Sequence, residues 1–584
     1  MKRYTILQTI AIICLLCSAL SCKKLNEDQP LELINQNYVF NATDSIGTYT
    51  QQFLNSIYAS LPQGYNRIGS NMLDAGTDDA VPNSVTDNVQ YYSTGGINAS
   101  VIPDNTWAAD YAGIRKVNIF LSQIGRVKLQ ASMAGYKNRW IAEARCLRAM
   151  FYFELIKRWG GVPLVGDQVL DPGQNITIPR SSYTDCVNYI ITELNTAMPN
   201  LLSANAAGTF SAGNYGRFSR GAAMALKARL LLYAASPLNN PTNDVTKWQA
   251  AAKAAKDIID SVAAGNFTYK LNTTATTKHY TTTTLAGITT PANMAAYINS
   301  VNVFLSTFST ISNNEIILPY MAAPNTTVEF YNDPVGFPRG GQGKTNPTQE
   351  LVNEFEMTNG KMITDSTSGY ASTMPYYNRD PRFPATIMFD GLYWLNRPVQ
   401  TFDGGLDRPL GYGRATSGET RTGYYLRKFM TSNGSSTAYA NQNHVFPIMR
   451  YAEVLLNYAE AQNEAVGPDA SVYAQINAIR ARVGMPALPA GLSQADMRTR
   501  IRHERRVEMA FEEQRFWDIR RWKIAENVLN GTLHGVQGIN NGSSVTYNVV
   551  SVMNTSFNAS KMYLFPIPFY EIASDPAITQ NPNW

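Results

Sequence analysis

The stretch AEARCLRAMFYFELIKRWGGVPLV, residues 142–165, shows how this chain begins to fold. With the residues just before it, it places apolar side chains at helical spacing along one face, namely Trp140, Ala144, Leu147, Phe151 and Leu155. Gly160 and Gly161 then end the helix, and Pro163 fixes the turn that follows. We therefore predict a long helix over residues 136–158 that buries one face and ends in a sharp turn.

Similar periodicity extends to both sides of this stretch. The predicted helices cover residues 44–61 and 105–123 before it, and residues 183–201, 219–235 and 246–263 after it. Their lengths and short connections predict antiparallel pairs stacked as a tetratricopeptide-like helical-repeat scaffold. A fixed period of about 34 residues is not visible. The prediction therefore depends on helix length and spacing.

The second half of the chain is less regular. Residues 265–444 are rich in Gly, Pro, Asn and Thr, and their apolar segments are short. This texture predicts irregular loops, a few short strands and one helix near residues 349–355. Helices return at residues 449–466, 471–483 and 493–529, and the tail from residue 564 is proline-rich and extended.

The first residues predict export and lipid attachment. A basic start precedes a mostly apolar run over residues 6–20, which is too short to span a membrane but typical of a secretory signal. Small Ser21 precedes Cys22, as lipidation of a cysteine thiol requires. Two lipid chains suffice for stable attachment to a membrane. We predict lipidation at Cys22; plain secretion and a retained helix are the alternatives.

These segments give a domain organisation and a fold class. The predicted units are a signal peptide (1–21), a lipidated tether (22–43), a helical-repeat region (44–264) and a loop-rich, helical C-terminal region (265–584). The expected fold is mostly α, with a few short strands in the irregular region.

Composition narrows the class of protein. The chain has 584 residues, of which 44% are hydrophobic and 16% charged, and this describes a large globular protein with an uncharged polar surface. Its formal net charge of +5 is too small to indicate nucleic acid as the main partner. Beyond the predicted signal and its cysteine, Cys146 and Cys186 remain. They form no disulfide framework, and we expect both to be buried.

Short motifs for catalysis and cofactor binding fail at their own spacing. His503 and Glu504 lack the second histidine of a zinc protease, because Val507 stands at its position. The GKT at residues 343–345 lacks the first glycine of a phosphate-binding loop, because Pro338 stands there. No G-x-S-x-G is present. We expect no metal, no cofactor and no catalytic residue.

Paired carboxylates occur at Glu512 and Glu513, and such pairs can serve acid–base catalysis. Here they lie in ERRVEMAFEEQRFWDIRRW, residues 504–522, which is dense in charges of both signs. The predicted helix-face pairs are Glu512 with Arg515 and Asp518 with Arg521. We interpret the two carboxylates as structural ion-pair partners.

Seven stretches, taken together, resemble the SusD/RagB family of outer-membrane nutrient-binding lipoproteins. They are residues 142–165, NPTQELVNEFEMTNGK (346–361), NRDPRF (378–383), RYAEVLLNYAEAQNE (450–464), INAIRARV (476–483), residues 504–522, and the terminal LFPIPFYEI with QNPNW. They follow one another in the order of the family and run along nearly the whole chain.

The resemblance implies an α-rich fold with tetratricopeptide-like helix pairs on one side. It also implies a partner, a SusC-type TonB-dependent transporter of the outer membrane, over which the lipoprotein acts as a lid. The implied function is capture of oligo- or polysaccharide without cleavage. Some relatives serve peptide uptake, so a peptide-binding subunit is an alternative, as are a scaffold without a ligand of its own and, more remotely, a glycan hydrolase.

Candidate ligand contacts come from loops, because aromatic rings stack on sugar faces while polar side chains bind hydroxyls. The early loop over residues 62–105 supplies Asp78, Asn83, Tyr91 and Tyr92. A central region supplies Tyr280, Tyr331, Phe337 and Arg339, and a third region supplies Tyr376, Tyr377, Tyr393 and Trp394. The ligand site of the family draws on the early loop and on central insertions. The alternative is that each ring packs its own loop.

Overall fold

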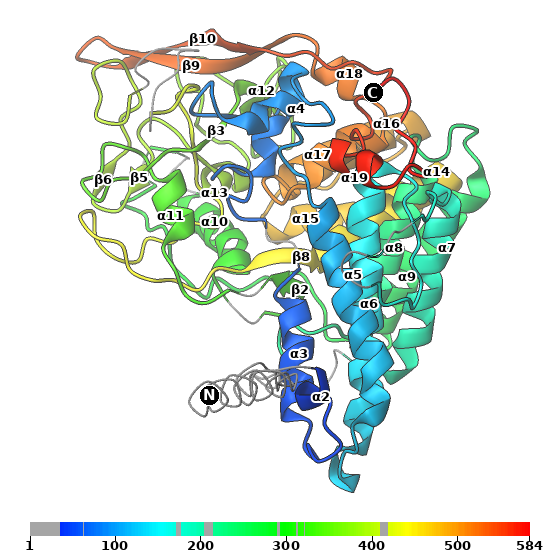
Figure 1. Cartoon of the computed structure of the whole chain (residues 1–584). Coiled ribbons are helices and arrows are strands. Elements are labelled where there is room, and N and C mark those ends of the chain that lie inside the picture. Colours follow the sequence, from blue (N-terminus) through cyan, green and yellow to red (C-terminus); the bar gives the residue numbers. More distant parts are fainter. Residues whose placement is uncertain are drawn as a thin grey trace, which may run out of the picture.

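The computed structural model describes residues 36–61, 64–170, 174, 177–203, 214–285, 287–288, 293–310, 313–320, 322–408 and 419–584. In these residues, helices pack on one side of the molecule, and loops with short strands form the other (Figure 1). The mostly helical fold predicted from the sequence is confirmed. The predicted signal peptide, Cys22 and the first part of the tether lie outside the described residues. Of the helices described, none is both long and apolar enough to cross a membrane.

A stack of helices forms the scaffold. Its first members are α3 (Thr48–Tyr58), α5 (Trp107–Gln123), α6 (Ala134–Trp159), α7 (Tyr183–Ala197), α8 (Arg220–Ala235) and α9 (Val245–Ala263). Each helix from α5 to α9 contacts the next, as stacked repeats do. The stack continues with α14 (Tyr451–Ala465), which packs on α8 and α9, and with α15 (Ala470–Arg482) and α16 (Gln494–Glu508), which pack on α14.

Helix α6 ends where the glycine pair predicts. Gly160 adopts a φ of 74°, a conformation that favours glycine. Gly161 passes so close to the next segment that a Cβ there would lie 2.0 Å from the carbonyl oxygen of Ser181. The indole N–H of Trp159 donates to the carbonyl of Pro566 at 2.9 Å. The proline-rich C-terminal strip therefore lies against the end of this helix.

The irregular side contains five antiparallel strand pairs among the described residues. These are β1 (Ala80–Pro82) with β3 (Thr345–Pro347), β2 (Ile316–Tyr320) with β8 (Phe446–Arg450), β4 (Ile387–Met388) with β7 (Tyr425–Leu426), β5 (Tyr393–Trp394) with β6 (Arg397–Pro398), and β9 (Thr532–Asn540) with β10 (Val545–Asn554). Short helices join them: α11 (Thr327–Asn332), α12 (Gln349–Glu354) and α13 (Arg382–Thr386). The pairing of β1 with β3 and of β2 with β8 ties together segments that are far apart in the sequence.

The longest elements missed from the sequence are one helix and one hairpin, and the short helices α11, α13 and α19 (Phe569–Ser574) were missed as well. Helix α10 (Met294–Ser309) lies in the stretch predicted to be irregular. Its sequence, MAAYINSVNVFLSTFS, is rich in β-branched, aromatic and small polar residues, which favour helices only weakly, and it follows a Thr-rich stretch. The hairpin of β9 and β10 was also missed, although an Asn-Gly pair at residues 541–542 lies in its turn.

The single long helix predicted over residues 493–529 is wrong. The structure has α16, then α17 (Gln514–Arg521) and α18 (Ala525–Val528). Phe511 and Glu513 adopt left-handed φ values of 61° and 60°, and Lys523 one of 53°. Helical propensity is strong here, so tertiary contacts override it. They turn Glu512 and Arg515 toward partners on other segments.

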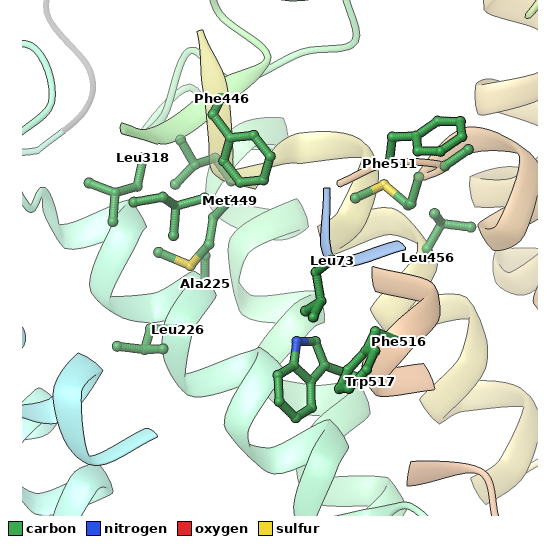
Figure 2. Close-up of a cluster of buried hydrophobic side chains, with 14 of the residues drawn as sticks. Leu73, Ala225, Leu226, Leu318, Phe446, Met449, Leu456, Phe511, Phe516 and Trp517 are labelled. Atoms are coloured by element: carbon green, nitrogen blue, oxygen red, sulfur yellow. The ribbon is translucent and has the colours of Figure 1, made fainter. Parts of the chain in front are cut away.

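Hydrophobic side chains fill the junction between the scaffold and the irregular side (Figure 2). The cluster brings together Leu226 of α8, Leu318 of β2, Met449 of β8, Trp517 of α17 and Leu73 from the early loop, and all five are buried. Burying side chains of this size stabilises the fold by about 1.5–3 kcal/mol each. The two sides therefore share one core.

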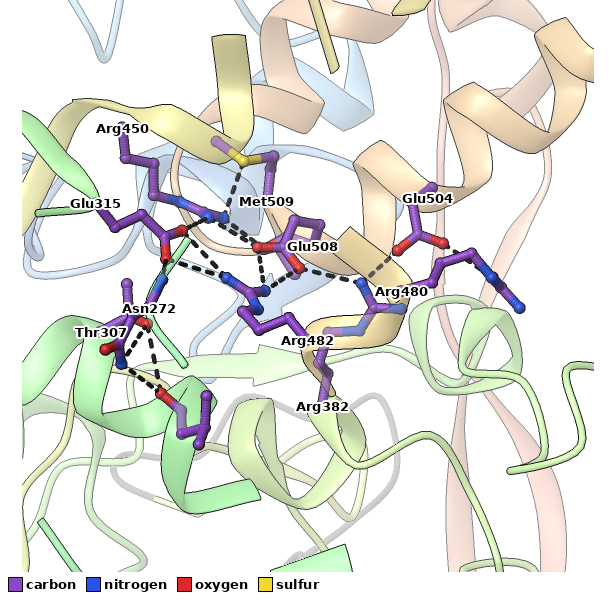
Figure 3. Close-up of polar contacts among 12 residues, drawn as sticks. Asn272, Thr307, Glu315, Arg382, Arg450, Arg480, Arg482, Glu504, Glu508 and Met509 are labelled. Carbon is purple, nitrogen blue, oxygen red and sulfur yellow. Dashed lines mark hydrogen bonds and ion pairs between the residues drawn. The ribbon is translucent and has the colours of Figure 1, made fainter. Parts of the chain in front are cut away.

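A buried network of arginines and carboxylates lies beside this core (Figure 3). Arg450 binds Glu315, Glu508 and Glu512 at 2.7 Å, and Arg482 binds Glu315 and Glu508. The structural role predicted for Glu512 is confirmed, but its partners are Arg450 and Lys428, not Arg515. The other predicted pair, Asp518 with Arg521, is present at 2.8 Å. Cys146 and Cys186 are both buried and unpaired.

Candidate functional site

A concave pocket with three partly exposed tyrosine rings lies where the early loop meets the irregular side. Tyr65, Tyr320 and Tyr331 supply the rings, and the volume is about 310 Å³. The other lining residues are Asn66, Ser70, Ala322, Ala323, Asn325, Thr327, Val328 and His444. We call it the tyrosine pocket. Its size is at the lower end of small-molecule sites.

The early loop is held against α11 on one wall of the pocket. Asn66 and Ser70 adopt left-handed φ values of 48° and 70°, and the Asn66 amide donates to the Ser70 carbonyl at 2.7 Å. The amide of Asn332, the last residue of α11, donates to the Asn66 side chain at 3.0 Å. This exchange fixes the loop relative to the helix that carries Tyr331.

Tyr65 is held by other aromatic rings. Its ring meets Phe429 and Phe446 edge to face, with centroids 5.2 and 5.1 Å apart. Burial of the hydroxyl, with the nearby carboxylates of Glu329 and Glu512, raises the pKa of Tyr65 well above its ordinary value. The hydroxyl therefore stays protonated and can both donate and accept. It has no hydrogen-bond partner among the described residues.

The imidazole ring of His444 lies beside the ring of Tyr65 and contacts the buried carboxylate of Glu329. Its Nε2 lies 2.9 Å from both oxygens of Glu329, and the backbone N–H of Thr431 donates to the same carboxylate at 2.8 Å. These contacts hold the imidazole ring of His444 against the carboxylate. Nδ1 of His444 has no partner within the described part of the chain. Two buried polar atoms, Nδ1 and the Tyr65 hydroxyl, thus remain available near the pocket.

A second cavity of about 510 Å³ lies between α5 and α19 (Phe569–Ser574). Its walls are mainly apolar and include Trp107, Ile114, Leu170 and Ile578. The tyrosine pocket offers more hydroxyl, amide and imidazole groups beside its rings. It therefore suits a ligand rich in hydroxyl groups better.

The structure places most predicted early-loop residues in the interior. Burial by itself would raise the pKa of Asp78, but Arg506 and Arg515 outweigh it and lower the pKa to about 2. The side chain of Asn83 is buried and donates to the carbonyl of Gln342 at 2.8 Å. These side chains tie the loop to the C-terminal helices and to the segment before β3.

The two predicted tyrosines of this loop differ. Tyr92 is buried, stacks on Phe565 with centroids 5.1 Å apart, and accepts a hydrogen bond from the Asp104 N–H at 2.7 Å. Tyr91 is partly exposed and packs against Gly96.

Two predicted residues, Arg339 of the central region and Trp394 of the third, converge on the buried carboxylate of Asp333. Arg339 forms an ion pair with Asp333, and the indole N–H of Trp394 donates to Asp333 at 3.1 Å. Burial raises the pKa of Asp333 to about 6, although Arg339 opposes the rise. Phe337 is buried under the guanidinium of Arg397, 3.9 Å from its ring centroid.

The remaining predicted residues are divided between interior and surface. Tyr280 is buried, and its hydroxyl accepts from Arg427 at 2.9 Å. Tyr376 is buried among aromatic rings, whereas Tyr377 and Tyr393 are partly exposed. Tyr331 lies in the tyrosine pocket. It is the one predicted ligand contact among the described residues that line the pocket.

Sequence reasoning missed the other polar and aromatic pocket residues. Tyr65 lies inside the predicted functional loop, so its signal was the loop itself. Tyr320 ends a buried strand, and His444 is an isolated histidine in a polar stretch. No local pattern marks either one, because the pocket is assembled from three segments that are distant in sequence, namely residues 65–70, residues 320–331 and His444.

Comparisons with known proteins agree with this fold. Residues 319–584 match the family described as "SusD family", and residues 32–232 match the one described as "Starch-binding associating with outer membrane". SusD-like protein P25 of Formosa agariphila is 21% identical over 539 residues, which cover 89% of this chain and 90% of that protein. SusD-like protein P2 of the same organism is 32% identical, but the match spans 23% of this chain and about a quarter (24%) of that relative.

Solved structures extend the likeness to the tertiary fold. A SusD-like protein from Bacteroides fragilis superposes with a TM-score of 0.73 at 28% identity, covering 92% of this chain and 98% of that one. A laminarin-binding SusD-like protein superposes with a TM-score of 0.60 at 24% identity, covering 92% and 100%. The two family matches together extend over both the scaffold and the irregular side. This chain therefore belongs to the SusD/RagB family.

Proposed function

We propose that this protein is a glycan-binding lipoprotein of the outer membrane that captures oligo- or polysaccharide in the tyrosine pocket. It delivers the glycan to a SusC-type TonB-dependent transporter and acts as its lid. The observation that carries the proposal is the pocket itself, with three partly exposed tyrosine rings around about 310 Å³. The matched family description names starch binding and the outer membrane, and one structural neighbour is named as laminarin-binding.

The pocket chemistry supports a sugar ligand. Tyrosine rings present apolar faces to the C–H groups of a pyranose, while the hydroxyls of Ser70 and Thr327 offer donors and acceptors to its hydroxyls. The Tyr65 hydroxyl and Nδ1 of His444 provide two further groups. His444 and Glu329 bind each other, so we assign them to positioning and binding, not to acid–base chemistry.

The ligand contacts predicted from the sequence separate into two proposed roles. We propose that Tyr331 contacts the glycan and that Tyr91, which is also partly exposed, reaches an extended ligand. The buried residues hold the loops in place through the partners described above. They are Asp78, Asn83, Tyr92, Tyr280, Phe337, Arg339 and Trp394.

Binding to a panel of glycans tests this function. Affinity electrophoresis and calorimetry should detect binding of a glycan such as laminarin or starch. Tyr331→Ala and Tyr320→Ala should weaken it about tenfold, which corresponds to about 1.4 kcal/mol. Tyr570→Ala is the matched control, because that ring is the most exposed large hydrophobic side chain described and does not line the tyrosine pocket.

Three outcomes would favour the alternatives. Tight binding of peptides with no binding of any glycan would indicate a peptide-importing subunit. Co-purification with a transporter whose uptake survives loss of Tyr65, Tyr320 and Tyr331 together would indicate a scaffold without a ligand of its own. Release of products from a labelled polysaccharide by the pure protein would indicate a hydrolase.

A further inference from the structure

The end of the scaffold that carries Gln36 gathers exposed aromatic side chains. Helices α2 (Gln36–Val39) and α3 and the start of α6 lie at this end, at the bottom of Figure 1. Tyr38, Ile46, Tyr49 and Tyr136 are 45%, 52%, 37% and 39% exposed. Of the four tyrosines described as more than a third exposed, three lie here, and Tyr570 is the fourth. This concentration distinguishes the end from the rest of the described surface.

These side chains belong to one continuous surface built from two segments. The rings of Tyr38 and Tyr49 have centroids 4.6 Å apart. Arg126 donates to the side chain of Asn37 at 3.0 Å, and Gly47 packs on Trp140 so closely that a Cβ would come within 2.6 Å of its ring. Residues 36–49 and 124–140 therefore form one unit. We call it the basal surface, defined by Tyr38, Ile46, Tyr49, Arg126, Lys128 and Tyr136.

The basal surface is also positively charged. Within residues 124–140 no acidic residue occurs, whereas four basic residues do: Arg126, Lys128, Lys137 and Arg139, the last of which is buried and pairs with Glu143. Arg126 and Lys128 are exposed. Among the described residues of this end, Asp44 is acidic, and it accepts hydrogen bonds from the backbone N–H groups of residues 47, 48 and 49.

The length of chain before Gln36 limits how far this end can be from a membrane. Cys22 and Gln36 are 14 positions apart in the sequence. A fully extended chain of that length reaches at most about 50 Å. A lipid on Cys22 would therefore keep the basal surface near the bilayer.

We propose that the basal surface rests on anionic lipid headgroups beside the anchor. This inference rests on the lipid attachment in the proposed function. Tyrosine suits the membrane–water boundary, because its ring is apolar and its hydroxyl stays hydrated. Arg126 and Lys128 would bind headgroup phosphates, and each such cation strengthens binding about fivefold at an anionic surface. The contact orients the scaffold that presents the tyrosine pocket.

Vesicle binding tests the proposal without the acyl chains. The mature chain with Cys22→Ser is sedimented with vesicles of phosphatidylcholine containing phosphatidylglycerol, and with vesicles of pure phosphatidylcholine. We expect binding to the anionic vesicles only. Lys128→Gln should weaken it about fivefold, and adding Tyr38→Ser with Tyr136→Ser should weaken it further. The matched control is Tyr570→Ser with Lys253→Gln, since both residues are exposed on other surfaces.

The possible results of the vesicle experiment either support or overturn the proposed membrane contact. Equal binding to both vesicle types, or no loss in the basal variants, overturns the proposal. Absence of vesicle binding also overturns it, and loss of co-purification with a transporter in the same variants would then show a protein interface. Glycan binding is measured on every variant and should be unchanged. A chain that binds vesicles but no glycan refutes the proposed function and leaves this inference standing.

Discussion

Replacing Glu508 with glutamine should destabilise the fold more than any change at the tyrosine pocket. The Glu508 carboxylate is fully buried at the end of α16 and binds three guanidinium groups. Its oxygens lie 2.6 Å from Arg482, 2.7 Å from Arg450 and 3.0 Å from Arg382. Glutamine keeps the shape of the side chain, but it removes the charge and turns an NH₂ group toward at least one arginine.

The expected loss of stability depends on how many carboxylate partners the three arginines keep after the substitution. Removing one partner of a buried ion pair costs about 3–5 kcal/mol, because the remaining charge is buried without compensation. Here Arg450 and Arg482 keep Glu315, and Arg382 keeps Glu504, so the loss should stay near the lower end of that range. We expect the free energy of unfolding to fall by about 3 kcal/mol.

Urea unfolding at neutral pH, followed by circular dichroism, measures this loss. The matched control is Asp257→Asn, which breaks an exposed pair with Lys253 and should cost about 0.5 kcal/mol or less. A loss of less than about 1 kcal/mol for Glu508→Gln would refute the reasoning, because the network would then contribute no more than an exposed pair.

The effect of Glu508→Gln on the free energy of unfolding should also depend on pH. Burial opposes ionisation of Glu508, but Arg482, Arg450 and Arg382 outweigh it and hold its pKa far below the ordinary value of 4.5. A depressed folded-state pKa contributes stability above the unfolded pKa, and this contribution is lost as the pH falls. The difference between wild type and Glu508→Gln should therefore narrow below about pH 4.5. A gap that widens in acid would contradict this assignment.

Three further changes test other parts of the structure. Gly161→Ala should cost about 1–3 kcal/mol in urea unfolding, since its Cβ would strike the Ser181 carbonyl, whereas Gly135→Ala, with nothing within 4 Å, should cost nothing. Burial raises the pKa of Asp110 to about 7, so it stabilises the fold in its protonated form. As the pH rises from 4 to 7, the free energy of unfolding of the wild type should fall, and that of Asp110→Asn should fall less. Equal pH dependence of the two unfolding free energies would count against this role of Asp110. Cys22→Ser should reduce membrane retention and glycan uptake in cells and leave glycan affinity unchanged, and a large loss of affinity would contradict the anchor role.

Helices with regular apolar spacing or strong helix-forming residues could be predicted from the sequence. The predicted ends of the helices now labelled α7, α8 and α9 fall within a few residues of the observed ends, because periodicity and N-cap residues such as Ser182 and Ser219 are local signals. Helix α10 was missed because its β-branched, aromatic and small polar residues favour helices only weakly. The stretch over 493–529 was misjudged because its breaks are imposed by ion pairs with distant segments.

The candidate site shows the same limit. Charged and aromatic residues in the early loop, such as Asp78 and Tyr92, suggested an exposed binding surface. The structure buries them, because Arg506 and Arg515, more than 400 residues away, neutralise Asp78, and Phe565 stacks on Tyr92. Burial of such polar groups is stable only when another segment supplies a partner for them.

The sequence by itself determined the family, the helical scaffold and the predicted anchor at Cys22. These depend on motifs, periodicity and spacing, which are properties of neighbouring residues. The tertiary structure decided which tyrosines face a pocket, which carboxylates are buried in ion pairs, and that three tyrosines meet basic residues at the end near Gln36. These depend on contacts between segments far apart in the chain, and burial and pKa are set by those contacts.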